Sequence, residues 1–90
     1  MSLISRDMVL RQVARDFPEP EVAARAVELL RQYGDDSYEL SVNTVHLAIL
    51  LLSFGKLSRL QELVEDAKRD FRGVLFQAQC LKGFGRLLSI

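Results

Sequence analysis

Residues 57–78 of this chain read LSRLQELVEDAKRDFRGVLFQA, and this stretch decides the fold class. Apolar residues recur in it at spacings of three and four, which is the period of one face of an α-helix. The stripe consists of Leu57, Leu60, Val64, Ala67, Phe71, Val74, Leu75 and Ala78. The residues between them are mostly charged. A helix of this kind buries its stripe against other helices, so the sequence predicts a packed all-α domain with a long C-terminal helix.

Gly73 interrupts this stretch, and a glycine inside a helix costs about 1 kcal/mol relative to alanine. The apolar stripe keeps its phase on both sides of the glycine. We therefore predict one continuous helix, with a bend at Gly73 as the alternative. Ser58 and Gln61 have the spacing of a capping box at the start of this helix. The short connection after Gly55 predicts that the helix packs antiparallel to the one before it.

The segment before Gly55 is expected to form the central helix of the bundle. From Val45 to Leu52 every residue except His46 is apolar. A helix that is apolar on nearly all sides is surrounded by other helices. Asp36 and Glu39 have capping-box spacing, so we expect the helix to begin there. Gly55 is expected to end it.

Two further helices are predicted in the N-terminal third. The first runs from about Ser5 to Asp16, and Pro18 prevents its continuation because the residue before a proline avoids the α region. The second starts near Pro20, which suits a first helical position, and Gly34 is expected to close it in the left-handed conformation. We therefore expect a single domain over residues 1–90, a compact bundle of four helices, or of five if the last is broken.

The predicted core combines the apolar stripes of the four helices. The stripe of the first helix consists of Leu10, Val13, Ala14 and Phe17, with Met8 beside it. The whole predicted core is Leu10, Val13, Phe17, Val22, Ala26, Leu30, Tyr33, Val45, Ala48, Ile49, Leu52, Leu60, Val64, Ala67, Phe71, Val74 and Leu75.

Composition limits the class of protein. Apolar residues make up 49% of the chain and charged residues 27%, which is typical of a globular protein. Twelve basic and twelve acidic residues cancel, whereas nucleic-acid binders usually carry a basic domain or stripe. The apolar runs are far shorter than the roughly 20 residues that cross a bilayer, and the N-terminus lacks the apolar core of a signal peptide. We expect a cytoplasmic protein, with neither nucleic acid nor a membrane as partner.

His46 and Cys80 are the two single residues with chemical potential. A neutral imidazole can act as a base or a metal ligand, but His46 has no second histidine with which to share a metal. We prefer to interpret it as a structural histidine that makes one hydrogen bond. Cys80 is the only cysteine, which excludes an intrachain disulfide. We expect it to be a small apolar filler near a helix end and not a nucleophile.

The charged clusters give no sign of a metal or catalytic site. The acidic residues within 35–39 lack the ligand spacing of a calcium loop and are explained by helix capping. The densest cluster, residues 65–72, contains favourable pairs of Glu65 with Lys68 and with Arg69. We interpret it as a solvated face, with a docking surface for a charged partner as the alternative. No catalytic, metal-binding or cofactor-binding residues and no cofactor are predicted.

Two segments resemble those of a group of small bacterial proteins of about this length. Residues 47–57, LAILLLSFGKL, are similar to their L-A-I-L-x-L-S-x-G-x-L segment, and residues 67–75, AKRDFRGVL, to their A-K-x-D-[YF]-R-x-V-L segment. Residues 31–35, RQYGD, are similar to their R-Y-G-D turn. The group is described as conserved and hypothetical, without an assigned activity. The resemblance implies a bacterial, soluble, helical protein and supplies no catalytic residues.

Residues 81–90, LKGFGRLLSI, carry a surplus of apolar side chains. They are Leu81, Phe84, Leu87, Leu88 and Ile90. Their number exceeds what so small a core readily absorbs, and exposed apolar patches tend to mark interfaces. The alternative is that this segment packs back on its own bundle.

The leading hypothesis is therefore a non-enzymatic helical interaction module, either a homo-oligomer or a binder of another protein. One alternative is a small enzyme that uses His46 or the Asp70/Arg72 pair. A less favoured alternative is a helix-turn-helix DNA reader over Val45 to Asp66. Acidic residues on its candidate recognition helix would repel phosphate.

Overall fold

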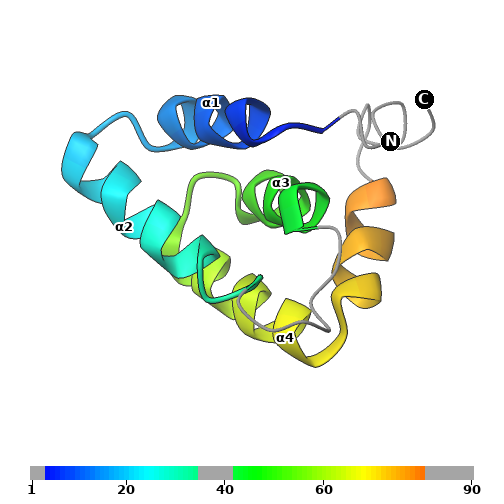
Figure 1. Ribbon diagram of the computed structural model, residues 1–90. Helices are drawn as coiled ribbons and strands as arrows, with labels where there is room; N and C mark the ends of the chain where they lie inside the picture. Colours follow the sequence, from blue (N-terminus) through cyan, green and yellow to red (C-terminus); the bar gives the residue numbers. More distant parts are fainter. Residues whose placement is uncertain (1–3, 35–41, 81–90) are drawn as a thin grey trace.

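The computed structural model describes residues 4–34 and 42–80, which form helices and connecting turns without a strand (Figure 1). The helices are α1 (Arg6–Asp16), α2 (Pro20–Leu30), α3 (Val42–Ser53) and α4 (Leu57–Gln79). α3 packs against α1 and α4, and α2 packs against the same two helices. The all-α bundle of four helices with a long C-terminal helix is thus confirmed.

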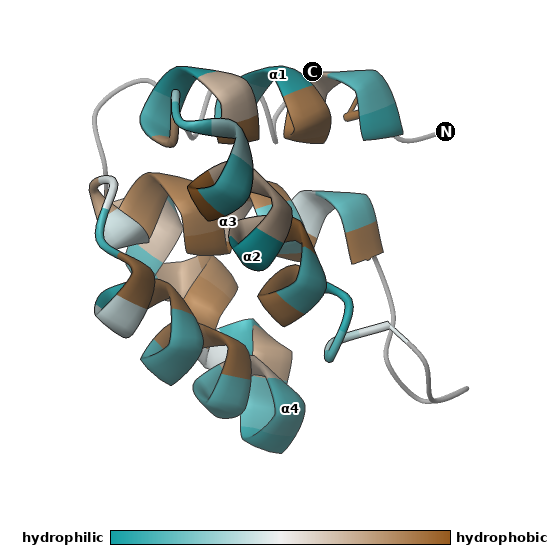
Figure 2. Ribbon diagram, turned by 90° about the vertical axis from the view of Figure 1, so that its left-hand side faces the viewer, coloured by the Kyte–Doolittle hydropathy of each residue, from teal (hydrophilic) through white to brown (hydrophobic). Residues whose placement is uncertain are grey.

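α3 is the central helix that its apolar run predicts. Every residue from Val45 to Leu50 is buried. Figure 2 shows α3 between α1 and α4, largely brown, whereas the outward sides of the other helices carry hydrophilic residues. The helix ends at Ser53, and the chain then turns through positive φ angles of 51° at Phe54 and 76° at Gly55. Gly55 therefore follows the end of the helix in the left-handed region, as expected.

α1 and α3 run in the same direction, although α2 separates them in sequence. Arg6 at the start of α1 contacts His46 in the first half of α3. At the other end, a Cβ added to Gly55, just past α3, would lie 3.4 Å from the carbonyl oxygen of Asp16. The two helices are therefore side by side and parallel over the whole of α1.

The buried face of α1 is rotated from the predicted one, with Val9 buried in place of Leu10. Val9 and Val13 are buried, whereas Leu10 is 43% exposed and Ala14 is exposed. Adjacent helical residues are about 100° apart around the axis, so burial of Val9 in place of Leu10 means that α1 is rotated about its axis relative to the prediction. Arg6 lies on the same face as Val9 and Val13, and its contact with α3 fits the observed orientation. The prediction that Leu10 and Ala14 face the core is wrong.

The remaining predicted core residues are buried or pack partly buried against the core. Val22, Phe71 and Leu75 are the partly buried ones. The core also contains Ile4, Val9 and Leu63, which were not predicted to be buried. Four further core residues lie on the apolar faces or runs predicted for their helices, namely Leu29, Leu47, Leu50 and Ala78.

α4 is bent, as Figure 1 shows, and the bend is at Asp70, where the backbone is not helical. The backbone there is extended, with φ −159° and ψ 97°. The Asp70 Oδ1 atom accepts hydrogen bonds from the Arg72 backbone N–H at 3.1 Å and from Arg72 Nε at 3.2 Å. This is how an N-cap residue starts a helix, so Asp70 caps residues 71–79. The bend is at Asp70 and not at Gly73, where an added Cβ would meet no atom within 4 Å.

The predicted capping boxes have different outcomes. The N-cap of α4 is Lys56, and no side chain caps the helix start. The capping box of Ser58 with Gln61 is therefore wrong. The box of Asp36 with Glu39, and with it the start expected for the central helix, lies outside the described residues.

The cap at Asp70 makes a pH-dependent prediction. Hydrogen bonds from the Arg72 side chain and backbone hold the pKa of Asp70 below its ordinary value of 3.8. A lowered carboxyl pKa stabilises the fold above the unfolded-state pKa, and this stabilisation is lost as pH falls through the folded-state pKa. We expect Asp70→Ala to melt at a lower temperature than the wild type at neutral pH, with the difference shrinking below pH 3.8.

The matched control is Asp70→Asn, because asparagine is an equally good N-cap without a titrating group. It should melt close to the wild type at neutral pH. Carboxyl carbon shifts followed by NMR over a pH titration measure the pKa directly. A value at or above 3.8 would contradict the cap.

Candidate functional site

The single histidine lies where α1, α3 and the turn after α2 meet. His46 on α3 is only 2% exposed. Its Nδ1 atom is 2.8 Å from Arg6 Nη1 on α1, and its Nε2 atom is 2.9 Å from the carbonyl oxygen of Tyr33, which follows α2. The Tyr33 ring is edge-on to the imidazole, with centroids 6.1 Å apart, and tilted against Phe71 of α4 at 6.5 Å.

These two contacts fix the protonation of the ring. A guanidinium donates hydrogen bonds but cannot accept them, so Nδ1 of His46 accepts from Arg6. The ring proton is therefore on Nε2, which donates to the Tyr33 carbonyl. Nδ1 is the nitrogen that a general base would use, and the Arg6 guanidinium already occupies it.

The hydrogen bond from His46 to Tyr33 belongs to a cap on the turn after α2. The last carbonyls of a helical segment lack partners within the helix. Here Lys68 of α4 donates from Nζ to the Gln32 carbonyl at 2.7 Å, and His46 donates to the Tyr33 carbonyl. Side chains from α3 and α4 thus hold the end of α2. His46 has the burial and partners of a structural histidine. It forms hydrogen bonds with both Arg6 and Tyr33, where one hydrogen bond was predicted.

The other sequence candidates lie apart from His46. Asp70 and Arg72 form the helix cap described above, and their side chains are 56% and 80% exposed. Cys80 is exposed at the end of α4, so the prediction of an apolar filler is wrong. Across residues 4–34 and 42–80, no three His, Cys, Asp or Glu side chains lie close enough together to hold a metal ion.

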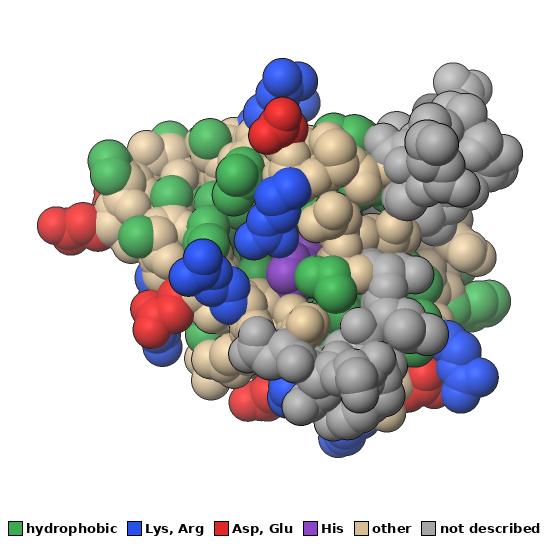
Figure 3. All heavy atoms as spheres, viewed as in Figure 1, with side chains coloured by type: hydrophobic (Ala, Val, Ile, Leu, Met, Phe, Trp, Pro, Cys, Tyr) green, Lys and Arg blue, Asp and Glu red, His purple; other side chains and the backbone are tan. Residues whose placement is uncertain are grey.

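The charged face of α4 pairs differently from the prediction. Arg69 bonds to Asp66, and Lys68 reaches Gln32, so neither of the expected pairs with Glu65 is the one observed. Arg59 pairs with Glu62 at 3.0 Å. On the face shown in Figure 3, basic and acidic side chains are interspersed. The described surface seen there has no block of one sign.

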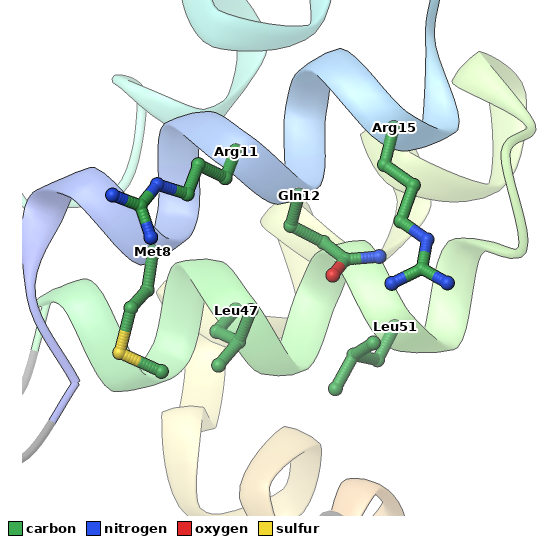
Figure 4. A pocket seen from close by; sticks show the side chains of 6 residues that line it. All are labelled: Met8, Arg11, Gln12, Arg15, Leu47 and Leu51. Atoms are coloured by element: carbon green, nitrogen blue, oxygen red, sulfur yellow. The ribbon is translucent and has the colours of Figure 1, made fainter.

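Small hollows lie on the described surface. One, of about 230 Å³, is between α1 and α3 and is lined by Met8, Arg11, Gln12, Arg15, Leu47 and Leu51 (Figure 4). Another, of about 270 Å³, is at the turn between α1 and α2 and is lined by Asp16, Phe17, Pro18, Glu19, Val22 and Gly55. Both are smaller than the roughly 300–1,000 Å³ of small-molecule sites. Neither is lined by His46, Asp70 or Arg72.

Exposed aromatic residues mark other parts of the surface. Phe76 near the end of α4 is 69% exposed, and Phe54 in the turn after α3 is 72% exposed. The predicted interface residues Leu81, Phe84, Leu87, Leu88 and Ile90 lie outside the described residues. Phe76 is the large exposed apolar side chain that precedes them most closely in the described chain.

Comparison of the chain with protein-family models, with curated proteins and with solved structures found no significant match. The resemblance to small conserved bacterial proteins therefore remains a prediction. Among the described residues, no helix has the length and apolar character needed to span a bilayer.

Replacing His46 tests its structural role. His46→Leu leaves the Tyr33 carbonyl and the Arg6 guanidinium without this partner, so we expect the free energy of unfolding to fall by about 1–3 kcal/mol. Urea unfolding followed by circular dichroism measures it. In His46→Gln the amide reaches toward the Nε2 position and should keep the hydrogen bond to Tyr33. This variant should therefore lose less stability than His46→Leu. Equal stability of the wild type and His46→Leu would contradict this structural role.

Proposed function

We propose that this chain is a non-enzymatic helical interaction module that self-associates, in the cytoplasm, through the C-terminal part of the sequence. The observation that carries the proposal is Phe76, which is 69% exposed on α4. Five apolar residues follow it within 81–90. An exposed aromatic side chain next to further apolar residues is typical of an interface.

Burial of such residues would stabilise a complex appreciably. Fully burying a phenylalanine side chain contributes about 1.5–3 kcal/mol. In a symmetric dimer each interface residue contributes twice, because the same patch occurs on both partners. Small domains with limited cores often gain stability in this way.

The alternatives receive less support from the described residues. The lone pair on Nδ1 of His46 accepts a hydrogen bond from Arg6, and Asp70 and Arg72 form an exposed helix cap. On the candidate recognition helix of a DNA reader, Arg59 is paired with Glu62, and Lys68 donates to the Gln32 carbonyl. Basic groups engaged in this way attract phosphate weakly.

The test compares two exposed phenylalanines in the full chain by size-exclusion chromatography with light scattering. We expect Phe76→Ser to weaken association by at least about tenfold. Phe54→Ser, which removes an equally exposed ring elsewhere, should associate like the wild type. Equal weakening by both substitutions, or none by Phe76→Ser, would contradict an interface that includes Phe76.

A further inference from the structure

The hollow between α1 and α3 has the composition of a docking groove. Its floor consists of Met8, Leu47 and Leu51, of which Leu47 is buried and the other two are half-buried. Figure 4 shows Arg11 and Arg15 extending from α1 on opposite sides of Gln12, above this apolar row. Because α1 and α3 are parallel, the furrow between them is straight. An additional helix can lie along such a furrow and insert side chains into it.

The two arginines on the rim differ from the four arginines of the described residues that form ion pairs. Arg25, Arg59, Arg69 and Arg72 each pair with a carboxylate. Within the described ranges, Arg11 and Arg15 form no ion pair. They are also four residues apart on one helix, where two like charges repel each other. Asp16, next to Arg15, accepts hydrogen bonds from Gln12, and Asp7, one turn before Arg11, forms no ion pair with it among the described residues. A carboxylate-bearing partner would offset this repulsion.

We infer that this groove binds an acidic amphipathic helix of another protein, with leucine-like side chains on the floor and carboxylates at Arg11 and Arg15. Guanidinium groups bind carboxylates through paired hydrogen bonds, which fixes the register of such a helix. The hollow of about 230 Å³ suits one or two side chains better than a small-molecule ligand. This goes beyond the proposed self-association, which uses Phe76.

Charge also decides between candidate occupants. Residues 81–90 of the same sequence contain Lys82 and Arg86 and no acidic side chain. Their basic groups would repel Arg11 and Arg15, so a second copy of that segment fits the groove poorly. A nucleic acid would meet the two arginines but would leave the apolar floor uncovered. An acidic helix satisfies both the floor and the rim.

The probe is a synthetic peptide of about 18 residues, long enough to be helical, with leucines at helical spacing and flanking glutamates. A matched peptide has lysine in place of each glutamate. Binding to the full chain is measured by fluorescence anisotropy. We expect the glutamate peptide to bind at least about tenfold more tightly than the lysine peptide. Equal binding of the two peptides, or no binding of the glutamate peptide, would overturn the proposal.

Variants locate the binding site. The double variant Arg11→Glu/Arg15→Glu should weaken binding of the glutamate peptide by about tenfold or more. The matched control is Arg25→Glu, an exposed arginine on α2 outside the groove, which should bind like the wild type. Unchanged binding by the double variant would overturn the groove. Tight binding of a DNA duplex or of phosphatidylserine vesicles that also depends on Arg11 and Arg15 would overturn the assignment to a protein partner.

The same titration on the full-length Phe76→Ser variant separates this inference from self-association. Peptide affinity should be unchanged there, because Phe76 is not among the residues that line the groove. Loss of peptide binding in that variant would contradict a separate groove. A monomeric wild type that binds the glutamate peptide would refute self-association and would support the groove.

Discussion

Leu50→Ala is expected to lower the free energy of unfolding by about 2–5 kcal/mol. Leu50 lies in the middle of α3 and is fully buried. Removing its side chain loses contacts on several sides at once, because α3 is enclosed between α1 and α4. A domain of this length has a total stability of roughly 5–13 kcal/mol, so the loss is a large share of it.

Leu51→Ala is the matched control for Leu50→Ala. The two leucines are adjacent on one helix, but Leu51 is half-buried at the groove between α1 and α3. Leu51→Ala should therefore lower the free energy of unfolding by less than half as much as Leu50→Ala. Urea unfolding at one fixed protein concentration measures both, since association stabilises the folded state by mass action. Similar losses at both positions would contradict the central place of α3.

Gly34→Ala is expected to lower the free energy of unfolding by about 2–3 kcal/mol. Gly34 has a φ of +118°, a backbone conformation that residues with a side chain rarely adopt. An added Cβ would also lie 2.9 Å from Cγ1 of Val42, at the start of α3. The substitution therefore strains the backbone and crowds the first turn of the central helix.

A second substitution separates the two costs at Gly34. Val42→Ala removes the crowded methyl groups but leaves the φ unchanged, so the double variant should recover only part of the loss. Gly73→Ala is the control for replacing a glycine: nothing lies within 4 Å of the added Cβ, and it should stabilise by up to about 1 kcal/mol. Full recovery in the double variant, or no loss in Gly34→Ala, would contradict the positive φ.

The bundle itself could be predicted because α2 and α4 each carry an apolar stripe, and because α3 is apolar on nearly all sides and must be enclosed. α1 was ambiguous, since Val9 and Leu10 are adjacent and either completes a stripe with Val13. Its orientation depends on a contact between residues 40 positions apart, Arg6 and His46. Such a contact leaves no periodic signal in the sequence.

The bend in α4 shows a different limit. Helix propensity indicates Gly73 as the weak position. A propensity scale does not include hydrogen bonds in which a side chain replaces the backbone carbonyl as the acceptor of an N–H. The Asp70 carboxylate accepts a hydrogen bond from the Arg72 backbone N–H, and a new helical segment begins there. Aspartate is a preferred N-cap residue, so the signal was present in the residue type.

For the candidate sites, the sequence indicated which residues mattered but not their partners. The polar function of His46 was predictable from its lone place in an apolar run. The roles of the Tyr33 carbonyl and of Lys68 could not be predicted, because both take part in the cap only when α2, α3 and α4 pack together. The groove arginines were missed as well, since their significance lies in the ion pairs that they do not form within the described chain.

The mass of the full-length wild type in solution tests the proposed self-association most directly. Light scattering or sedimentation equilibrium over a wide range of protein concentration provides it. Self-association predicts a mass of twice the 10.2 kDa chain or more at high concentration, falling toward the monomer on dilution. A mass that remains at 10.2 kDa at every concentration would contradict it.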